Sequence, residues 1–200
     1  MDQRGARRLR TLTHVGALAP LAALLWMAWR DHLGPVPVAA ATRLLGRYAL
    51  ALLLLSLAPT AMRILTGDDA VMVTRRPLGL YAFLYAALHV LAFTGLDFGF
   101  DLGLLAAVIG ESRREMVGLG AFLILAALAL TSVPSLAKRL GKSWRWLHRG
   151  VYVAAGLVVL HFAWNYKELR TWPILSGVTL LLLLAWRLPP VARLAEHHRR

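Results

Sequence analysis

Two histidines lie deep inside long apolar stretches that contain no charged residue. His89 belongs to residues 77–96, a run of 20 residues without Asp, Glu, Lys or Arg, and His161 belongs to residues 150–166, a run of 17. An imidazole is expensive to keep in hydrocarbon, and the usual reason to keep one there is that it binds something. Two neutral imidazoles on two helices can hold a haem iron from both sides, and such axial ligands tune its redox potential. The pair therefore predicts a haem clamped between two helices.

The composition indicates that a membrane surrounds these helices. Apolar residues make up 58% of the 200 residues and charged residues only 16%, whereas soluble domains carry about 25% charged residues. Six uncharged runs, each near the roughly 20 residues that cross about 30 Å of hydrocarbon, predict six transmembrane helices. Their expected bounds are about 11–29, 46–64, 77–96, 116–135, 149–166 and 171–188. We thus expect an all-α, polytopic membrane bundle that forms one domain over residues 1–200.

Basic residues set the expected orientation of the bundle. With the N-terminus in the cytoplasm, seven of the 23 Lys and Arg fall outside and the other 16 inside, as the positive-inside rule favours. Both termini are then cytoplasmic. The formal net charge of +13 follows from this topology and from attraction to anionic lipid, so it does not require nucleic acid as a partner.

The chain contains no cysteine. This excludes disulfides, thiolate ligation of haem, cysteine-bound iron–sulfur clusters and thiol catalysis within the chain. Any redox chemistry must therefore use a bound cofactor.

The two buried histidines are expected at the same depth. His89 lies 13 residues beyond Arg76 and His161 lies 12 residues beyond Arg149, or about 20 Å and about 18 Å from the inner surface. This level is nearer the outer face. Each histidine alone could instead be a packing residue that is hydrogen-bonded to a neighbouring helix. A proton relay would normally bring buried carboxylates, and none of the six runs contains Asp or Glu.

His148 lies at the inner start of the fifth predicted helix, 13 positions before His161. With about 3.6 residues per turn, a straight helix does not aim both side chains at one point. His148 therefore belongs to a separate inner site, which would hold a second haem, a quinone or a flavin, unless it is simply an interfacial histidine. His14 and His32 are expected at the membrane interfaces.

Four basic residues near the inner ends of these helices are candidates for binding a flavin phosphate or a quinone: Arg75, Arg76, Lys142 and Arg145. They could equally be anchors that follow the positive-inside rule. The pair His197-His198 is expected to lie in a solvated tail.

Two outer connections are expected between the predicted helices. Residues 31–45 form the first and contain the helix breakers Gly34, Pro35 and Pro37. Residues 97–115 form the second and combine four acidic residues with an apolar patch at 102–109. This patch is a short helix lying on the membrane, a docking surface or a plain interfacial connector.

Four strings of the sequence together resemble the MsrQ family, formerly called YedZ. They are RRPLGLYAFLYAALH at 75–89, LTS at 130–132, LGKSWRWLHRGVY at 140–152 and LHFAWNYK at 160–167. The family comprises the haem-binding membrane subunits of bacterial methionine sulfoxide reductase systems and belongs to the ferric-reductase-like transmembrane superfamily. The resemblance covers residues 35–190.

The resemblance implies a function and a set of cofactors. Members of the family take electrons from the quinone pool, pass them through haem b and deliver them to MsrP, a periplasmic molybdopterin enzyme that reduces methionine sulfoxide in oxidised envelope proteins. FMN is also associated with the family, and the location is the bacterial inner membrane. His89, His148 and His161 correspond to the haem-linked histidines.

Two departures from the family pattern bear on the cofactor sites. Arg43 stands where members carry a histidine before Gly46, so a cofactor role at that position is in doubt. The third predicted helix has one histidine, His89, where chains of the superfamily often have two, which leaves His148 without an obvious partner.

The expected mechanism is electron transfer across the membrane, from quinol to the haem at His89 and His161 and then to a periplasmic partner. Only 12 residues follow Leu188, so we expect no soluble NADPH or FAD domain and instead an external donor and acceptor. The alternatives are a cytochrome b subunit for another periplasmic oxidoreductase, and a non-redox transporter or assembly protein.

Overall fold

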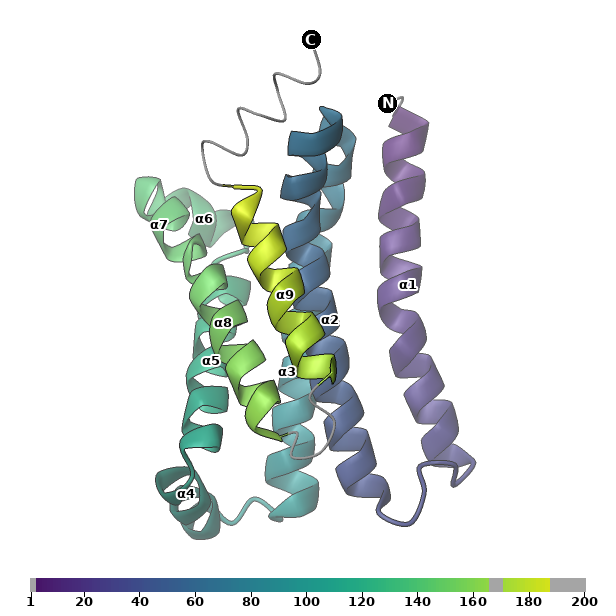
Figure 1. Ribbon diagram of the computed structural model, residues 1–200, viewed down its shortest axis with the longest axis vertical. Coiled ribbons are helices and arrows are strands. Elements are labelled where there is room, and N and C mark those ends of the chain that lie inside the picture. The colour runs from purple at the N-terminus through teal and green to yellow at the C-terminus, as the bar shows by residue number, and fades with distance from the viewer. Residues whose placement is uncertain (1–2, 166–170, 188–200) are drawn as a thin grey trace.

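The computed structural model describes residues 3–165 and 171–187, and every regular element within them is helical (Figure 1). The long helices are α1 (Gln3–Trp29), α2 (Pro37–Thr66), α3 (Arg75–Leu91), α5 (Arg113–Leu130), α8 (Gly150–Asn165) and α9 (Thr171–Ala185). The short elements are the 3₁₀ turn η1 (Asp69–Thr74), the π turn η2 (Ala92–Asp97), α4 (Leu102–Glu111), α6 (Pro134–Leu140) and α7 (Lys142–His148). The predicted all-helical membrane architecture is confirmed.

Four helical segments are long and apolar enough to cross a membrane: 4–29, 37–66, 69–97 and 142–165. A fifth span results if α5 and α6 count as one, although α6 bends away from α5 by 96°. Helix α9 has 15 residues and is shorter than a full span. The sixth span and the cytoplasmic position of both termini therefore stay predictions.

Helix α2 corrects the expected boundary of the first outer connection. The helix begins at Pro37, nine residues before the predicted start, with the proline in the first turn, where its missing N–H costs nothing. The predicted start was too late because only a run without charges was interpreted as the helix. Arg43 and Arg47 interrupt such a run, but both belong to α2 and lie on its exposed side. The helix ends at Thr66 and is capped by Gly67. This glycine has a φ of 75°, and its N–H donates to the Arg63 carbonyl.

The core is formed by two tightly packed helix pairs, α2 with α3 and α5 with α8. Tyr85 of α3 and Leu53 and Leu57 of α2 are fully buried between these elements. Helix α1 lies against the outside of the bundle (Figure 1) and is joined to α3 by a 2.8 Å hydrogen bond from the Tyr85 hydroxyl to the Ala17 carbonyl. Half-buried His89 belongs to the first pair and half-buried His161 to the second.

The predicted apolar patch at 102–109 forms the helix α4, and Asp101 caps it by accepting a 2.9 Å hydrogen bond from the Leu104 N–H. Leu102 is 79% exposed, as expected for a helix that faces lipid or a partner. Helix α4 lies at the opposite end of the molecule from the start of α1 and from α6 and α7 (Figure 1). Which of the proposed roles α4 has stays a prediction.

Candidate functional site

His89 reaches from α3 onto the surface of α2. Its Nδ1 lies 2.8 Å from the carbonyl oxygen of Thr42. A carbonyl only accepts hydrogen bonds, so Nδ1 carries the proton and Nε2 keeps a free lone pair. The ring rests on Gly46, where an added Cβ would lie 3.2 Å from Nδ1 and 3.3 Å from Cε1.

His161 has the same arrangement on the other helix pair. Its Nδ1 lies 2.9 Å from the carbonyl oxygen of Arg114 in α5, so this Nε2 also keeps its lone pair. The ring rests on Gly118, where a Cβ would lie only 2.8 Å from both Nδ1 and Cε1.

In both places the glycine follows the accepting carbonyl by four residues. A helical Cα–Cβ bond tilts toward the N-terminus, so the side chain at one position covers the turn before it. Thr42 and Gly46 form one such pair, and Arg114 and Gly118 form the other. In each pair the glycine keeps a Cβ away from the imidazole that contacts the carbonyl, and we call the two pairs the glycine–carbonyl seats.

The two seats bring the histidines together. The ring centroids of His89 and His161 lie 6.3 Å apart, and the ring planes cross at 76°. Two imidazoles that bind one metal ion from opposite sides, with metal–nitrogen bonds of about 2.0 Å, have centroids about 6.2 Å apart. The observed separation therefore fits a metal ion held between the two Nε2 atoms.

The ligand set of this pair favours haem over a bare metal ion. Within residues 3–165 and 171–187, no group of three or more His, Cys, Asp or Glu gathers closely enough to hold a metal ion. A porphyrin supplies four ligands itself, so two imidazoles complete the coordination. The exposed Asn165 places Nδ2 3.4 Å from Nε2 of His161, and this weak contact gives way easily to a stronger ligand.

A buried carboxylate fixes the N-terminal end of α5 beside His161. Glu115 is 9% exposed and accepts hydrogen bonds from the Ser112 hydroxyl at 2.6 Å and from Nε of Arg114 at 2.8 Å and 2.9 Å. Because Arg114 also supplies the carbonyl that holds His161, this network stabilises the seat. From the sequence, Glu115 was expected at the end of the connection 97–115, with no role of its own.

His148 lies in a separate cavity of about 420 Å³ at the end of the bundle that is predicted to face the cytoplasm, and we call it the inner cavity. Three of the four predicted basic residues also line this cavity, namely Arg75, Arg76 and Arg145, whereas Lys142 does not. His148 Nε2 lies 3.2 Å from the Thr131 hydroxyl. No second histidine lines the cavity among the described residues.

An unexpected cation lies beside this inner cavity. Arg187 donates from Nη2 to the Leu57 carbonyl at 2.7 Å and stacks over the Tyr152 ring at 4.9 Å, and both partners line the cavity. Its Nε and Nη1 are buried without a hydrogen-bond partner in the described part of the chain. Buried donors are nearly always paired, so this guanidinium is suited to an anionic group.

The other histidines take different positions. His14 bonds to the Tyr81 hydroxyl at 2.9 Å and lines a second cavity, and its expected position at the membrane interface stays a prediction. His32 is exposed between α1 and α2, as expected for an interfacial residue. The pair His197-His198 lies outside the described residues.

The seats could not be recognised in the sequence from polar side chains, because each consists of a backbone oxygen and a glycine without a Cβ. Gly46 and Gly118 were available as a signal, since each lies in an apolar run or next to one. Their contacts with histidines 43 residues away could only be found from the helix pairing.

Comparison with known proteins adds a family to this geometry. Residues 45–159 match the model of the ferric reductase like transmembrane component. The chain is 41% identical over 189 residues to the protein-methionine-sulfoxide reductase heme-binding subunit MsrQ of Bordetella pertussis, which covers 94% of this chain and 92% of that protein. It is also 41% identical to the MsrQ of Xanthomonas axonopodis pv. citri, over 89% of this chain and 84% of that protein. The MsrQ of Polaromonas naphthalenivorans is 37% identical over a similar length.

Proposed function

Because this chain belongs to the MsrQ haem-binding subunits within the ferric-reductase-like transmembrane family, we propose that it carries electrons through haem b from the quinone pool to a periplasmic partner. The partner is an MsrP-like molybdopterin enzyme that reduces methionine sulfoxide in oxidised envelope proteins. The chain acts in the bacterial inner membrane as the electron-transfer subunit of this oxidoreductase, and the substrate site is on the partner.

The observation that carries this proposal is the His89–His161 pair on its two seats. Haem bound there supplies reversible one-electron chemistry. The Thr42 and Arg114 carbonyls accept the Nδ1 protons of the two rings, which leaves both Nε2 atoms free and raises their basicity, so these two atoms would ligate the iron. Both rings are held by backbone atoms of rigid helices, so little rearrangement accompanies a change of charge.

The inner cavity has a second role in this proposal. Arg75, Arg76 and Arg145 line it and Arg187 lies beside it, and this positive charge suits the phosphate of FMN or a propionate of a second haem. His148 would then be a ligand or a hydrogen-bond partner of that cofactor. Lys142 lies outside the cavity lining and serves as a membrane anchor.

His148→Ala is expected to leave the outer haem in place, because His148 lies in the separate inner cavity and does not touch His89 or His161. The check is the amount of haem per protein in the purified variant, read from the reduced visible spectrum. A variant that lost all of its haem would contradict the assignment of His148 to a second site.

One reconstitution tests the proposed direction of electron flow. Proteoliposomes that contain the chain are reduced anaerobically with menadiol, and an MsrP-like protein with methionine sulfoxide is then added outside. The expected result is reoxidation of the haem together with formation of methionine. Haem that is reoxidised only by another periplasmic acceptor would favour a cytochrome b subunit of a different oxidoreductase, and absence of haem would favour a non-redox transporter or assembly protein.

A further inference from the structure

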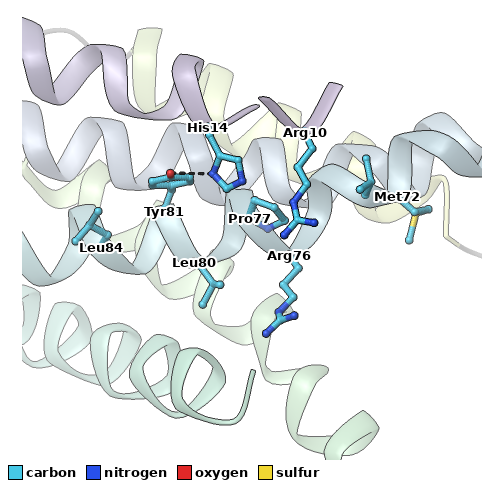
Figure 2. A pocket seen from close by; sticks show the side chains of 9 residues that line it. Arg10, His14, Met72, Arg76, Pro77, Leu80, Tyr81 and Leu84 are labelled. Carbon is cyan, nitrogen blue, oxygen red and sulfur yellow. Dashed lines mark hydrogen bonds between the residues drawn. The ribbon is translucent and has the colours of Figure 1, made fainter. Parts of the chain in front are cut away.

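A cavity of about 630 Å³ between α1 and α3 is not used by the function described so far (Figure 2). Such a volume is typical of small-molecule sites. Its nine lining residues come from three elements and are mostly apolar: Arg10 and His14 of α1, Met72 and Val73 of η1, and Arg76, Pro77, Leu80, Tyr81 and Leu84 of α3. The lining contains no Asp or Glu.

Two polar side chains meet inside this apolar lining. His14 and Tyr81 point toward each other from α1 and α3, with Nδ1 of His14 2.9 Å from the Tyr81 hydroxyl (Figure 2). In the tautomer in which Nδ1 donates to Tyr81, Nε2 can accept a proton and the Tyr81 hydroxyl can donate to a further oxygen. The pair thus offers one acceptor and one donor to a neutral ligand.

We propose that this cavity binds a quinol, with its head group against the hydrogen-bonded pair His14 and Tyr81. The inference rests on the proposed function, which needs a quinol site but does not locate one. An apolar aromatic ring with two hydroxyl groups matches an apolar cavity with one acceptor and one donor. Leu80 and Leu84, each 37% exposed, continue the apolar lining toward the middle of the membrane, where an isoprenoid tail would lie.

The position of the cavity suits electron transfer to the histidine pair. Tyr81, Tyr85 and His89 follow one another at intervals of four residues, so they lie on one face of α3. Eight residues separate Tyr81 from His89, which is about 12 Å along the helix axis. Buried Tyr85 fills the space between them and bonds to Ala17 of α1. Electrons tunnel readily over such a distance through packed protein.

The reaction balances with the groups at hand. One quinol loses two protons and two electrons and leaves as quinone. His14 Nε2 takes up each proton in turn and passes it to water at the inner mouth of the cavity, beside the exposed Arg10. A haem held by His89 and His161 would accept one electron at a time, so the second electron leaves the quinol site after the periplasmic partner of the proposed function has taken up the first.

The arrangement of charge separates this site from the inner cavity. Arg76 lines both cavities, but its guanidinium donates to the Ser132 carbonyl at 2.7 Å and is exposed. The inner cavity gathers cations for an anionic cofactor, whereas the centre of the α1–α3 cavity is formed by the neutral pair His14 and Tyr81. A lipid phosphate would use Arg10 and Arg76 at the mouth instead.

The test measures binding and reduction separately in the full-length, haem-loaded protein in phosphatidylcholine nanodiscs. Tyr81→Phe removes one hydroxyl and is expected to weaken decylubiquinone binding, measured by calorimetry, about tenfold. His14→Leu also removes the proton acceptor and is expected to slow haem reduction by decylubiquinol by about a hundredfold or more. Tyr48→Phe is the matched control, because Tyr48 lies on α2 outside the cavity lining.

The dithionite-reduced spectra of all variants must match the wild type, which shows that the haem site is intact. Wild-type binding affinity and reduction rate in both Tyr81→Phe and His14→Leu would overturn the proposal. The proposal would also be overturned if decylubiquinone binding were weakened only by Arg10→Gln and by added cardiolipin, because this result would indicate a lipid site. If decylubiquinol does not reduce the wild type although decylubiquinone binds in a Tyr81-dependent way, the quinone site stands and the proposed electron donor fails.

Discussion

His161→Ala and His89→Ala are each expected to abolish the low-spin haem. Each imidazole supplies one of the two axial ligands, and the alternative ligand Asn165 is a weak amide. The measurement is the ratio of haem to protein, together with the reduced visible spectrum, in detergent-purified variants. His32→Ala is the matched control, since it removes an exposed histidine from the connection between α1 and α2 and is expected to change nothing.

A second readout distinguishes loss of a ligand from loss of the fold. Free imidazole added to His161→Ala is expected to restore part of the low-spin spectrum, because the space left by the ring is open on the α5 side at Gly118. Retention of a wild-type low-spin spectrum by either alanine variant would mean that this histidine does not bind the haem iron.

Gly118→Ala is expected to have an effect nearly as large without touching a ligand. The added Cβ would lie 2.8 Å from Nδ1 and Cε1 of His161, so the ring must leave the Arg114 carbonyl. Loss of such a supporting contact typically costs about 10–100-fold in metal affinity. Haem titration of the apoprotein, followed by the Soret band, measures this loss.

Two other glycines calibrate the result. Gly46→Ala places its Cβ 3.2 Å from His89, a contact that a shift of a few tenths of an ångström relieves, so we expect a smaller loss of affinity. Gly120→Ala meets nothing within 4 Å and should bind haem like the wild type. If Gly118→Ala and Gly120→Ala bound haem equally well, the seats would have no role in holding the histidines.

The sequence indicated that His89 and His161 lie at one level because its signal is strong and simple. A long run without charges places a residue at a known depth, and His89 and His161 have nearly equal distances from the basic inner ends of their helices. In the structure the ring centroids of His89 and His161 lie 6.3 Å apart. The sequence also indicated a separate site for His148, because its 13-residue spacing from His161 does not aim both side chains at one point of a straight helix.

The rest could not be predicted because it depends on which helices pack together. Every residue of a helix has a backbone carbonyl. Only the pairing of α2 with α3 and of α5 with α8 determines that those of Thr42 and Arg114 contact the histidines. The contact between His14 and Tyr81 was missed because nothing in the local sequence shows that α1 brings His14 beside Tyr81. Pro37 was interpreted as a breaker, although a proline is equally suited to the first turn of α2.

The repeated seat explains how a helical bundle can hold a pair of ligands with little flexibility. Each helix pair carries one histidine, one backbone acceptor and one glycine, so the two halves of the site are built alike. Backbone acceptors in regular helices do not change rotamer, in contrast to side-chain acceptors. This rigidity suits a centre that must be reduced and oxidised repeatedly.

The visible spectrum of the purified, dithionite-reduced protein tests the central claim most directly. A haem held by His89 and His161 predicts the separate α and β bands of low-spin, six-coordinate haem b. A reduced spectrum without these bands, whether featureless or typical of high-spin haem with one protein ligand, would contradict the account.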